Sequence, residues 1–279
     1  LRCGKKVLLP LRSFISNTQK NRTMKIIIIG AGNVGTNLHH AFALKHIQAQ
    51  LVSSRDMQQL ALLSKDDGQG KIYLYTVADN ALESVIAHVN APKALHIHTS
   101  GSMPISVFGA DKPHAGVLYC FQSFSKQHLI DDWANIPIFV EGKSMDDLAS
   151  IYSVAQVLTS RVYEANQKDR ERLHIAGVFA NNFSNLMYRV AADLLHDTQI
   201  PFQALLPLID STAQKIHTLS PQQAQTGPAS RLDMNVINHH KEVLKKLNNK
   251  TDIPSDKIQQ LYQLLTQAIL DSNNTTHLL

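Results

Sequence analysis

The chain has 279 residues, of which 44% are hydrophobic and 18% are charged. This composition is typical of a globular protein with room for two domains, and it excludes a disordered or fibrous chain. The formal net charge of +5 arises in residues 1–23, which hold six basic residues and no acidic one, whereas the rest holds 21 basic and 22 acidic residues. Because the folded body is balanced in charge, we expect no nucleic-acid partner.

Residues 1–23 form a basic leader that we expect to lie outside the fold. The chain begins with Leu1, and Met24 directly precedes the first predicted strand, so Met24 is the expected initiator. A transit peptide is the alternative, since such leaders are also basic and free of acidic residues. The longest apolar run, residues 7–11, is too short for a signal peptide or a membrane span. Cys120 is the one cysteine after the leader, which excludes an internal disulfide and favours a cytoplasmic protein.

Residues 24–35 predict a strand, a glycine loop and the start of a helix. Four consecutive isoleucines, residues 26–29, suit a strand that is buried on both faces of a parallel sheet. In the Gly-x-Gly-x-x-Gly loop that follows, the first glycine makes the tight turn, the second admits a pyrophosphate and the third lets the helix pack closely. We therefore predict a dinucleotide site at the N-terminus of a helix over residues 33–46, formed by Gly30, Gly32, Asn33, Val34 and Gly35.

The end of the second predicted strand, residues 50–54, indicates which dinucleotide binds. A site specific for NAD usually has an acidic side chain here, which accepts hydrogen bonds from the ribose hydroxyls. This chain instead has Ser53, Ser54 and Arg55, whose hydroxyl and guanidinium donors suit a 2′-phosphate. We predict NADP as the cofactor. The alternative is that Arg55 is an ordinary solvated loop residue.

Strands and helices alternate up to about residue 165, which predicts an α/β fold with a Rossmann-type doubly wound parallel sheet over residues 24–165. From residue 166 onward no strand pattern occurs, and apolar residues recur every three or four positions on a helix of about thirty residues. Further helices are predicted at 203–219, 234–247 and 255–270. Residues 166–279 are therefore predicted to form an all-α domain for substrate binding and dimerisation.

Polar residues follow the third, fourth and fifth predicted strands, where ligands bind in α/β sheets. Ala78 and Asp79 follow the third strand, and Asp79 is expected to cap the next helix, with a cofactor contact as the alternative. His98 and Ser100 follow the fourth strand, as turn residues or as contacts to nicotinamide and substrate. Gln122 follows the fifth strand, where its amide satisfies a backbone group or binds substrate.

The helical half contributes four further candidates. A histidine titrates near neutrality, so His174 is a candidate donor of the proton that accompanies hydride transfer, with a structural role as the alternative. Asn182 lies two turns further along the same predicted helix. Arg231 is expected to clamp a substrate carboxylate that Asp233 orients, or the two form a simple ion pair. The adjacent histidine pairs of the chain lack thiolate or carboxylate companions at ligand spacing, so no metal site is predicted.

Five segments together resemble the Rossmann-like oxidoreductases whose C-terminal half is the helical domain of unknown function 2520. They are Gly30-Ala31-Gly32-Asn33-Val34-Gly35, His98-Thr99-Ser100-Gly101-Ser102, Gln122-Ser123-Phe124-Ser125, the stretch from His174 to Phe183 and the stretch from Gln225 to Asp233. The resemblance implies an NADP-binding domain and a C-terminal domain like that of 6-phosphogluconate dehydrogenase, pyrroline-5-carboxylate reductase and the β-hydroxyacid dehydrogenases. It also implies a homodimer formed through that domain, and it implies no particular substrate.

The chain departs from the β-hydroxyacid dehydrogenases at one position that matters for chemistry. Those enzymes carry a catalytic lysine one turn before an asparagine, and residues 177–182 contain no lysine. His174, or a substrate that arrives as a protonated iminium, then has to supply the proton. The family that this chain resembles also tends to have proline where Cys120 stands.

These patterns predict an NADP(H)-dependent oxidoreductase that transfers hydride to or from a small carbonyl or imine substrate between the domains. The expected catalytic residues are His174, Asn182 and Ser100. The expected substrate-binding residues are His98, Gln122, Arg231 and Asp233. A non-catalytic NADP-binding sensor is the alternative, and a third class is an enzyme that holds a different anion, such as an acyl or phosphate ester, at the glycine loop.

Overall fold

The computed structural model describes residues 25–65, 67–247 and 252–276. The predicted leader, residues 1–23, and Met24 lie outside the described residues. The chain divides into two compact units, the first ending at Val178 and the second beginning at Phe179. The domain boundary predicted after residue 165 lies just before α5 (Gln167–Gly177), the last helix of the first unit.

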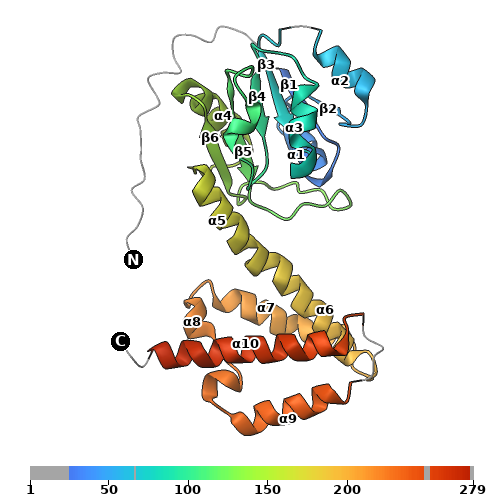
Figure 1. The fold of residues 1–279 in the computed structure, drawn as a ribbon, viewed down its shortest axis with the longest axis vertical. Coiled ribbons are helices and arrows are strands. Elements are labelled where there is room, and N and C mark those ends of the chain that lie inside the picture. Colours follow the sequence, from blue (N-terminus) through green and yellow to red (C-terminus); the bar gives the residue numbers. More distant parts are fainter. Residues whose placement is uncertain (1–24, 66, 248–251, 277–279) are drawn as a thin grey trace. The chain divides into compact units, whose positions relative to one another are not determined.

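The first unit is a seven-stranded sheet with helices on both faces (Figure 1). The strand order is β2-β1-β3-β4-β5-β6-β7, and every neighbouring pair is parallel except β5 and β6. The strands are β1 (Lys25–Ile29), β2 (Ala49–Val52), β3 (Lys71–Tyr75), β4 (Leu95–His98), β5 (Ala115–Cys120), β6 (Ile138–Gly142) and β7 (Val162–Glu164). The predicted Rossmann-type fold is confirmed, with one antiparallel pair, β5 and β6, that residues 121–137 connect without a crossover helix.

The helices of this unit cover a separate core on each face of the sheet. They are α1 (Asn33–Leu44), α2 (Met57–Leu63), α3 (Asp79–Ala87), the 3₁₀ turn η2 (Ile105–Phe108), α4 (Met145–Leu158) and α5. Ile26 and Ile28 pack with α1 and α4, whereas Ile27 and Ile29 pack with α2, α3 and η2. The four isoleucines of β1 are buried on both faces of the sheet, as their pattern predicts, because successive side chains of a strand point to opposite faces.

Two histidines of β4, His96 and His98, are completely buried. His96 stacks on the rings of Tyr73 and Tyr75, and its Nε2 donates to the carbonyl of Ala91. Its Nδ1 therefore accepts from the Tyr75 hydroxyl, 2.9 Å away. Burial lowers the pKa of each imidazole to about 4, so both rings are neutral in the folded protein at neutral pH.

We expect the protein to lose stability as the pH falls from 6.5 towards 4. In this window the unfolded chain protonates both histidines, whose ordinary pKa is 6.5, while the folded chain holds them neutral. At about pH 4 the free energy of unfolding is lower by up to about 3 kcal/mol per histidine. Above pH 6.5 the two histidines cause no loss, because they are neutral in the unfolded chain as well. Urea unfolding at pH 7.5 and pH 5 measures it. His96→Gln should show a smaller pH dependence than the natural chain, whereas the exposed His88→Gln should match it, and equal pH dependence in both variants would refute the assignment.

The second unit is helical. Its elements are a π-helical segment η3, which begins at the end of the first unit (Val178–Phe183), α6 (Ser184–Leu195), η4 (Phe202–Leu205), α7 (Leu206–Lys215), α8 (Pro221–Ala224), η5 (Ala229–Arg231), α9 (Met234–Lys245) and α10 (Ser255–Thr276). Two predictions need correction. The predicted thirty-residue helix has π geometry in its middle, over residues 178–183, a local widening that apolar periodicity alone does not reveal. The helix predicted over residues 203–219 begins as 3₁₀ and ends at Lys215.

The apolar residues of the second unit are largely exposed. Among its described residues the buried apolar side chains are Ala229, Ile237, Leu244 and Ile258. Three of the regularly spaced apolar residues on which the thirty-residue helix was predicted, Met187, Val190 and Leu194, lie in α6, yet that helix buries no side chain. Large exposed side chains occur throughout the unit, with Phe179, Leu208 and Leu264 each more than 60% exposed. None of the helices in the described ranges is both long enough and apolar enough to cross a membrane.

Candidate functional site

The glycine loop lies at the point where the sheet order reverses, between the carboxyl ends of β1 and β3. Gly30 has a φ of +120°, and a Cβ at this residue would lie 2.7 Å from the carbonyl oxygen of Thr76, just after β3. A Cβ on Gly35 would lie 1.9 Å from the carbonyl oxygen of Gly30. The Thr76 hydroxyl donates to that same carbonyl at 2.7 Å. Gly30 and Gly35 are thus required by the packing of β1, β3 and α1 on one another.

Gly32 differs from these two glycines. A Cβ on Gly32 would meet nothing closer than the Thr76 carbonyl oxygen, at 3.8 Å. Gly32 is also the N-cap of α1, and no side chain accepts from the first turn of that helix. The packing of the chain therefore does not require a glycine at residue 32. The missing side chain leaves the N-terminus of α1 accessible to an anion.

Asn33 and Val34, which were predicted to bind the cofactor, also serve the structure. The Oδ1 of Asn33 accepts from the backbone N–H of Lys126 in the β5–β6 loop, at 3.2 Å. Val34 packs against the core. One turn further on, the buried Asn37 donates to the carbonyl of Ser125 and accepts from the N–H of Ile130. Asn37 thus anchors this loop beside the start of α1. The sequence analysis did not single it out, although a polar residue among the apolar positions of a helix indicates such a role.

The segment after β2 presents the predicted donors for a 2′-phosphate. The Ser53 hydroxyl accepts from the backbone N–H of Arg55, at 3.3 Å. Ser54 is half-buried and Arg55 is exposed. No described residue accepts from the Arg55 guanidinium, so its donors are available to a ligand.

The loops after β3 and β4 are tied together by hydroxyl groups. The expectation that Asp79 caps α3 is wrong, because the N-cap is Ala78 and makes no side-chain bond. Asp79 instead accepts from the Ser102 hydroxyl at 2.6 Å, because its carboxylate faces the neighbouring loop. The Ser100 hydroxyl accepts from the N–H groups of Ser102 and Met103, at 3.2 and 3.0 Å. Ser100 therefore shapes this loop.

His98 lies beneath the same loop. Its Nδ1 accepts from the N–H of Ser100 at 3.3 Å, which leaves the proton of the neutral ring on Nε2. That Nε2 is buried without a hydrogen bond of normal geometry. Burial is the largest cause of the lowered pKa of His98, and the charge of Arg170 adds to it, while the Pro104 carbonyl opposes it.

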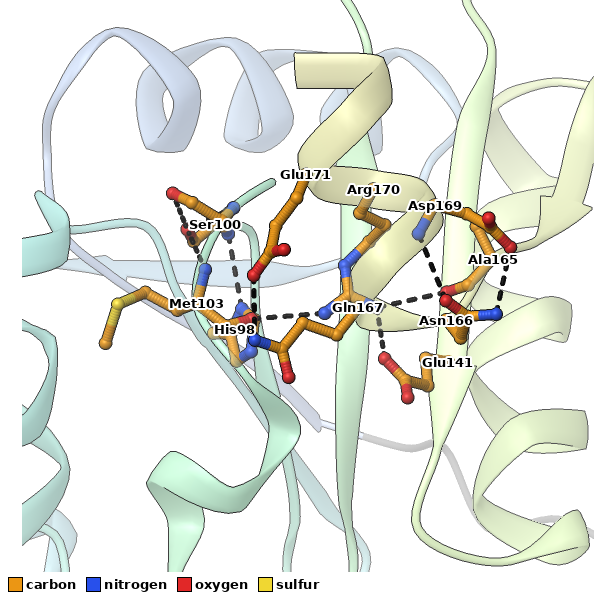
Figure 2. Close-up of polar contacts among 11 residues, drawn as sticks. His98, Ser100, Met103, Glu141, Ala165, Asn166, Gln167, Asp169, Arg170 and Glu171 are labelled. Atoms are coloured by element: carbon orange, nitrogen blue, oxygen red, sulfur yellow. Dashed lines mark hydrogen bonds and ion pairs between the residues drawn. The ribbon is translucent and has the colours of Figure 1, made fainter. Parts of the chain in front are cut away.

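Arg170, in the first turns of α5, is another residue that the sequence reasoning missed. Its side chain is fully buried and its guanidinium contacts three segments of the chain (Figure 2). It forms an ion pair with Glu141 of β6, donates to the carbonyl of Ala165 at 3.0 Å and donates to the carbonyl of Met103 at 3.1 Å. Through these contacts, Arg170 fixes the start of α5 against the loop that carries Ser100.

Near the far end of α5, His174 meets the end of β5. The Oη of Tyr119 lies 3.1 Å from the Nδ1 of His174, which is exposed. Burial raises the pKa of Tyr119 to about 12. Gln122 is exposed, and its Oε1 accepts from the N–H of Ser123 at 2.8 Å, so its amide serves a neighbouring backbone group.

The remaining predicted site residues lie in the second unit. Asn182 is exposed within the π-helical segment. Arg231 is exposed at the end of η5, and the carboxylate of Asp233 caps α9 by accepting from the N–H of Val236 at 3.2 Å. Arg231 and Asp233 form no ion pair with each other. Within the described residues, no group of three or more histidines, cysteines or acidic residues is placed to hold a metal ion.

Comparisons with known proteins agree with this architecture. The sequence model of the domain of unknown function DUF2520 matches residues 136–269. A protein of Bacteroides fragilis described as a candidate NADP oxidoreductase is 38% identical over 89% of this chain and 98% of its own, with a TM-score of 0.75. No curated sequence matches the chain at a significant level.

Two more distant structures share the fold. A reductive aminase of Aspergillus terreus in complex with NADPH and ethyl levulinate is 14% identical over 90% of this chain and 95% of its own, with a TM-score of 0.58. The pyrroline carboxylate reductase of Plasmodium falciparum with NADP bound is 11% identical over 88% of this chain and 99% of its own, with a TM-score of 0.53. Because the similarity to the Bacteroides protein covers nearly the whole of both chains, this chain belongs to the family of Rossmann-like NADP oxidoreductases with a C-terminal DUF2520 domain.

Proposed function

We propose that this chain is an NADPH-dependent oxidoreductase that acts on a small carbonyl or imine substrate. The observation that carries the proposal is the open N-terminus of α1 at the reversal point of the sheet, where Gly32 alone among the three loop glycines has room for a side chain. A pyrophosphate fits this position, since unpaired N–H groups and the helix dipole attract an anion. When bound, NADPH supplies a hydride.

Ser54 and Arg55 are proposed to hold the 2′-phosphate that distinguishes NADPH from NADH. The Arg55 guanidinium is exposed and has no acceptor among the described residues, so a phosphate gains a charge-assisted hydrogen bond there. The Bacteroides relative is itself described as a candidate NADP oxidoreductase, which supports the same preference.

The Arg55→Ala variant should bind NADPH about tenfold more weakly, a loss of about 1.4 kcal/mol. Its affinity for NADH should stay unchanged, because NADH lacks the phosphate that Arg55 contacts. Fluorescence titration with each nucleotide provides the measurement, and Lys45→Ala, which removes an exposed cation at the other end of α1, is the control. An unchanged NADPH affinity in Arg55→Ala would remove the structural basis for the NADP preference.

The reacting end of the cofactor is proposed to face the carboxyl ends of β4 and β5. Ser100, Ser102 and Asp79 form a hydrogen-bonded loop there, and His174 presents an exposed imidazole at the end of β5. We propose His174 as the proton donor, because residues 177–182 supply no lysine. We propose that the helical unit contributes three residues to the substrate site: Asn182, Arg231 and Asp233.

A screen of small keto acids, and of ketones paired with amines, tests for catalysis by following the loss of NADPH absorbance. The proposal expects turnover of at least one carbonyl or imine, with His174→Gln slower by about 100-fold. NADPH binding with no turnover across the screen would favour the non-catalytic sensor. No NADPH binding at all would contradict both functions.

We also propose that the helical unit forms a homodimer. Its described residues bury few apolar side chains and expose many large ones, and exposed apolar surface of this kind is typical of a surface that binds a partner. Leu264 in α10 is 68% exposed. Light scattering should give twice the chain mass of 31.0 kDa for the natural chain.

The Leu264→Glu variant should shift this mass towards the monomer, because it places a charge on the proposed interface. Leu62→Glu makes the same change at a residue of α2 that is 55% exposed, and it should leave the dimer intact. A monomeric natural chain, or dissociation by both variants alike, would count against dimerisation through the helical unit.

A further inference from the structure

We propose that Tyr119 is the positioning residue of the reaction, acting through His174 to set which ring nitrogen carries the transferable proton. The inference rests on the proposed function, since it concerns the proton that accompanies hydride transfer. Its basis is the hydrogen bond between the Oη of Tyr119 and the Nδ1 of His174, 3.1 Å long, with ring centroids 6.2 Å apart.

The ring of Tyr119 is fixed by its neighbours. A Cβ on Gly101, in the loop after β4, would lie 2.7 Å from the Cζ of Tyr119, so that loop packs directly on the ring. On its other side, Tyr119 meets the edge of Phe121 at a centroid distance of 6.0 Å. Phe121 in turn occupies the space that a side chain at Gly177 of α5 would need, 2.8 Å from its Cε2. Two glycines thus make room for two aromatic rings, and these rings hold the hydroxyl towards α5.

The chemistry of the hydrogen bond assigns the proton. Burial, together with the nearby groups of Cys120 and Asp79, raises the pKa of Tyr119 to about 12, so the phenol keeps its proton at neutral pH and is able to donate it. If the hydroxyl donates, Nδ1 of His174 is the acceptor, and a neutral imidazole then carries its one proton on Nε2. No described residue accepts from that Nε2, so its proton is available to a substrate.

The pair then works as a two-step relay during reduction of a carbonyl. The substrate oxygen takes the proton from Nε2, and Nδ1 takes the proton from the Tyr119 hydroxyl. After the product leaves, Nε2 takes a proton from water and Nδ1 returns its proton to the Tyr119 phenolate. The starting tautomer is thereby restored, and the net reaction consumes one hydride and one proton. A substrate that arrives as a protonated iminium bypasses the relay, because hydride transfer alone completes its reduction to the amine.

Nitrogen-15 NMR of histidine measures the proton position without cofactor or substrate. The protein is labelled at histidine and studied at pH 9, where imidazoles are neutral, and the His174 signals are those lost in His174→Gln. The natural chain should show the Nε2–H tautomer, and Tyr119→Phe should show a larger share of Nδ1–H. Tyr163→Phe, which removes a hydroxyl from an exposed ring of β7, should leave the spectrum of His174 unchanged. The same tautomer balance in Tyr119→Phe and in the natural chain would overturn the proposal.

Kinetics on a carbonyl substrate from the screen give the second readout. Tyr119→Phe keeps the ring that Gly101 and Phe121 contact, and it should lower kcat about tenfold while the NADPH affinity stays the same. The double variant with His174→Gln should be no slower than His174→Gln alone, because Tyr119 acts through that residue. Additive losses, or an unchanged kcat in Tyr119→Phe, would refute the relay. A natural chain that binds no NADPH would refute the proposed function instead, and the NMR result would still decide the proton position.

Discussion

The Gly32→Ala variant should unfold at the same temperature as the natural chain and yet bind NADPH about 100-fold more weakly, a loss of about 2.7 kcal/mol. A Cβ at Gly32 meets no atom of the chain closer than 3.8 Å, so the fold accepts it. It would, however, occupy the space through which the proposed pyrophosphate approaches the backbone. Thermal unfolding and NADPH titration on the same sample separate the two effects.

The matched control is the same substitution three residues further on. Gly35→Ala puts a Cβ 1.9 Å from the carbonyl oxygen of Gly30, so α1 has to move away from β1. We expect this variant to lose about 3 kcal/mol of stability, together with NADPH binding. If Gly32→Ala bound NADPH as tightly as the natural chain, the loop would not be a dinucleotide site. If Gly35→Ala unfolded at the natural temperature, the packing described here would be wrong.

Replacement of Arg170 by methionine should lower the free energy of unfolding by about 3 to 5 kcal/mol. Methionine fills similar space, but it leaves the Glu141 carboxylate without its ion-pair partner and the carbonyls of Ala165 and Met103 without a donor. Because the same contacts hold α5 near the loop of Ser100, activity should fall with stability. Urea unfolding gives the free energy.

Arg172→Met is the control, because Arg172 is exposed on the same helix two residues away. It should change stability by less than about 0.5 kcal/mol. Equal effects of the two substitutions would show that the buried contacts of Arg170 contribute nothing beyond the general properties of the helix.

The sheet and its glycine loop follow from sequence because their signals are local. The isoleucines of β1 are adjacent in the chain, and the tight turn at Gly30 and the close packing at Gly35 follow from the spacing of the glycines. The antiparallel pairing of β5 and β6 does not follow, because it depends on the course of the loop at residues 121–137. Asp79 illustrates the same limit, since its carboxylate serves Ser102, a residue of another loop, in place of its own helix.

The parts of the candidate site that could not be predicted from the sequence depend on contacts between residues far apart in the chain. Tyr119 and His174 are 55 residues apart, and Arg170 reaches Met103 across 67 residues. Neither contact leaves a periodic pattern in the chain. The helical unit adds a different difficulty, because α6 buries no side chain although Met187, Val190 and Leu194 recur on it at helical spacing.

Titration of the natural chain with NADPH and with NADH, at equal ionic strength, is the most direct test of a dinucleotide site that prefers NADPH. We expect saturable binding of NADPH at one site per chain, at least about tenfold tighter than the binding of NADH and weakened about 100-fold by Gly32→Ala. Absence of NADPH binding by a natural chain that is shown to be folded would contradict it.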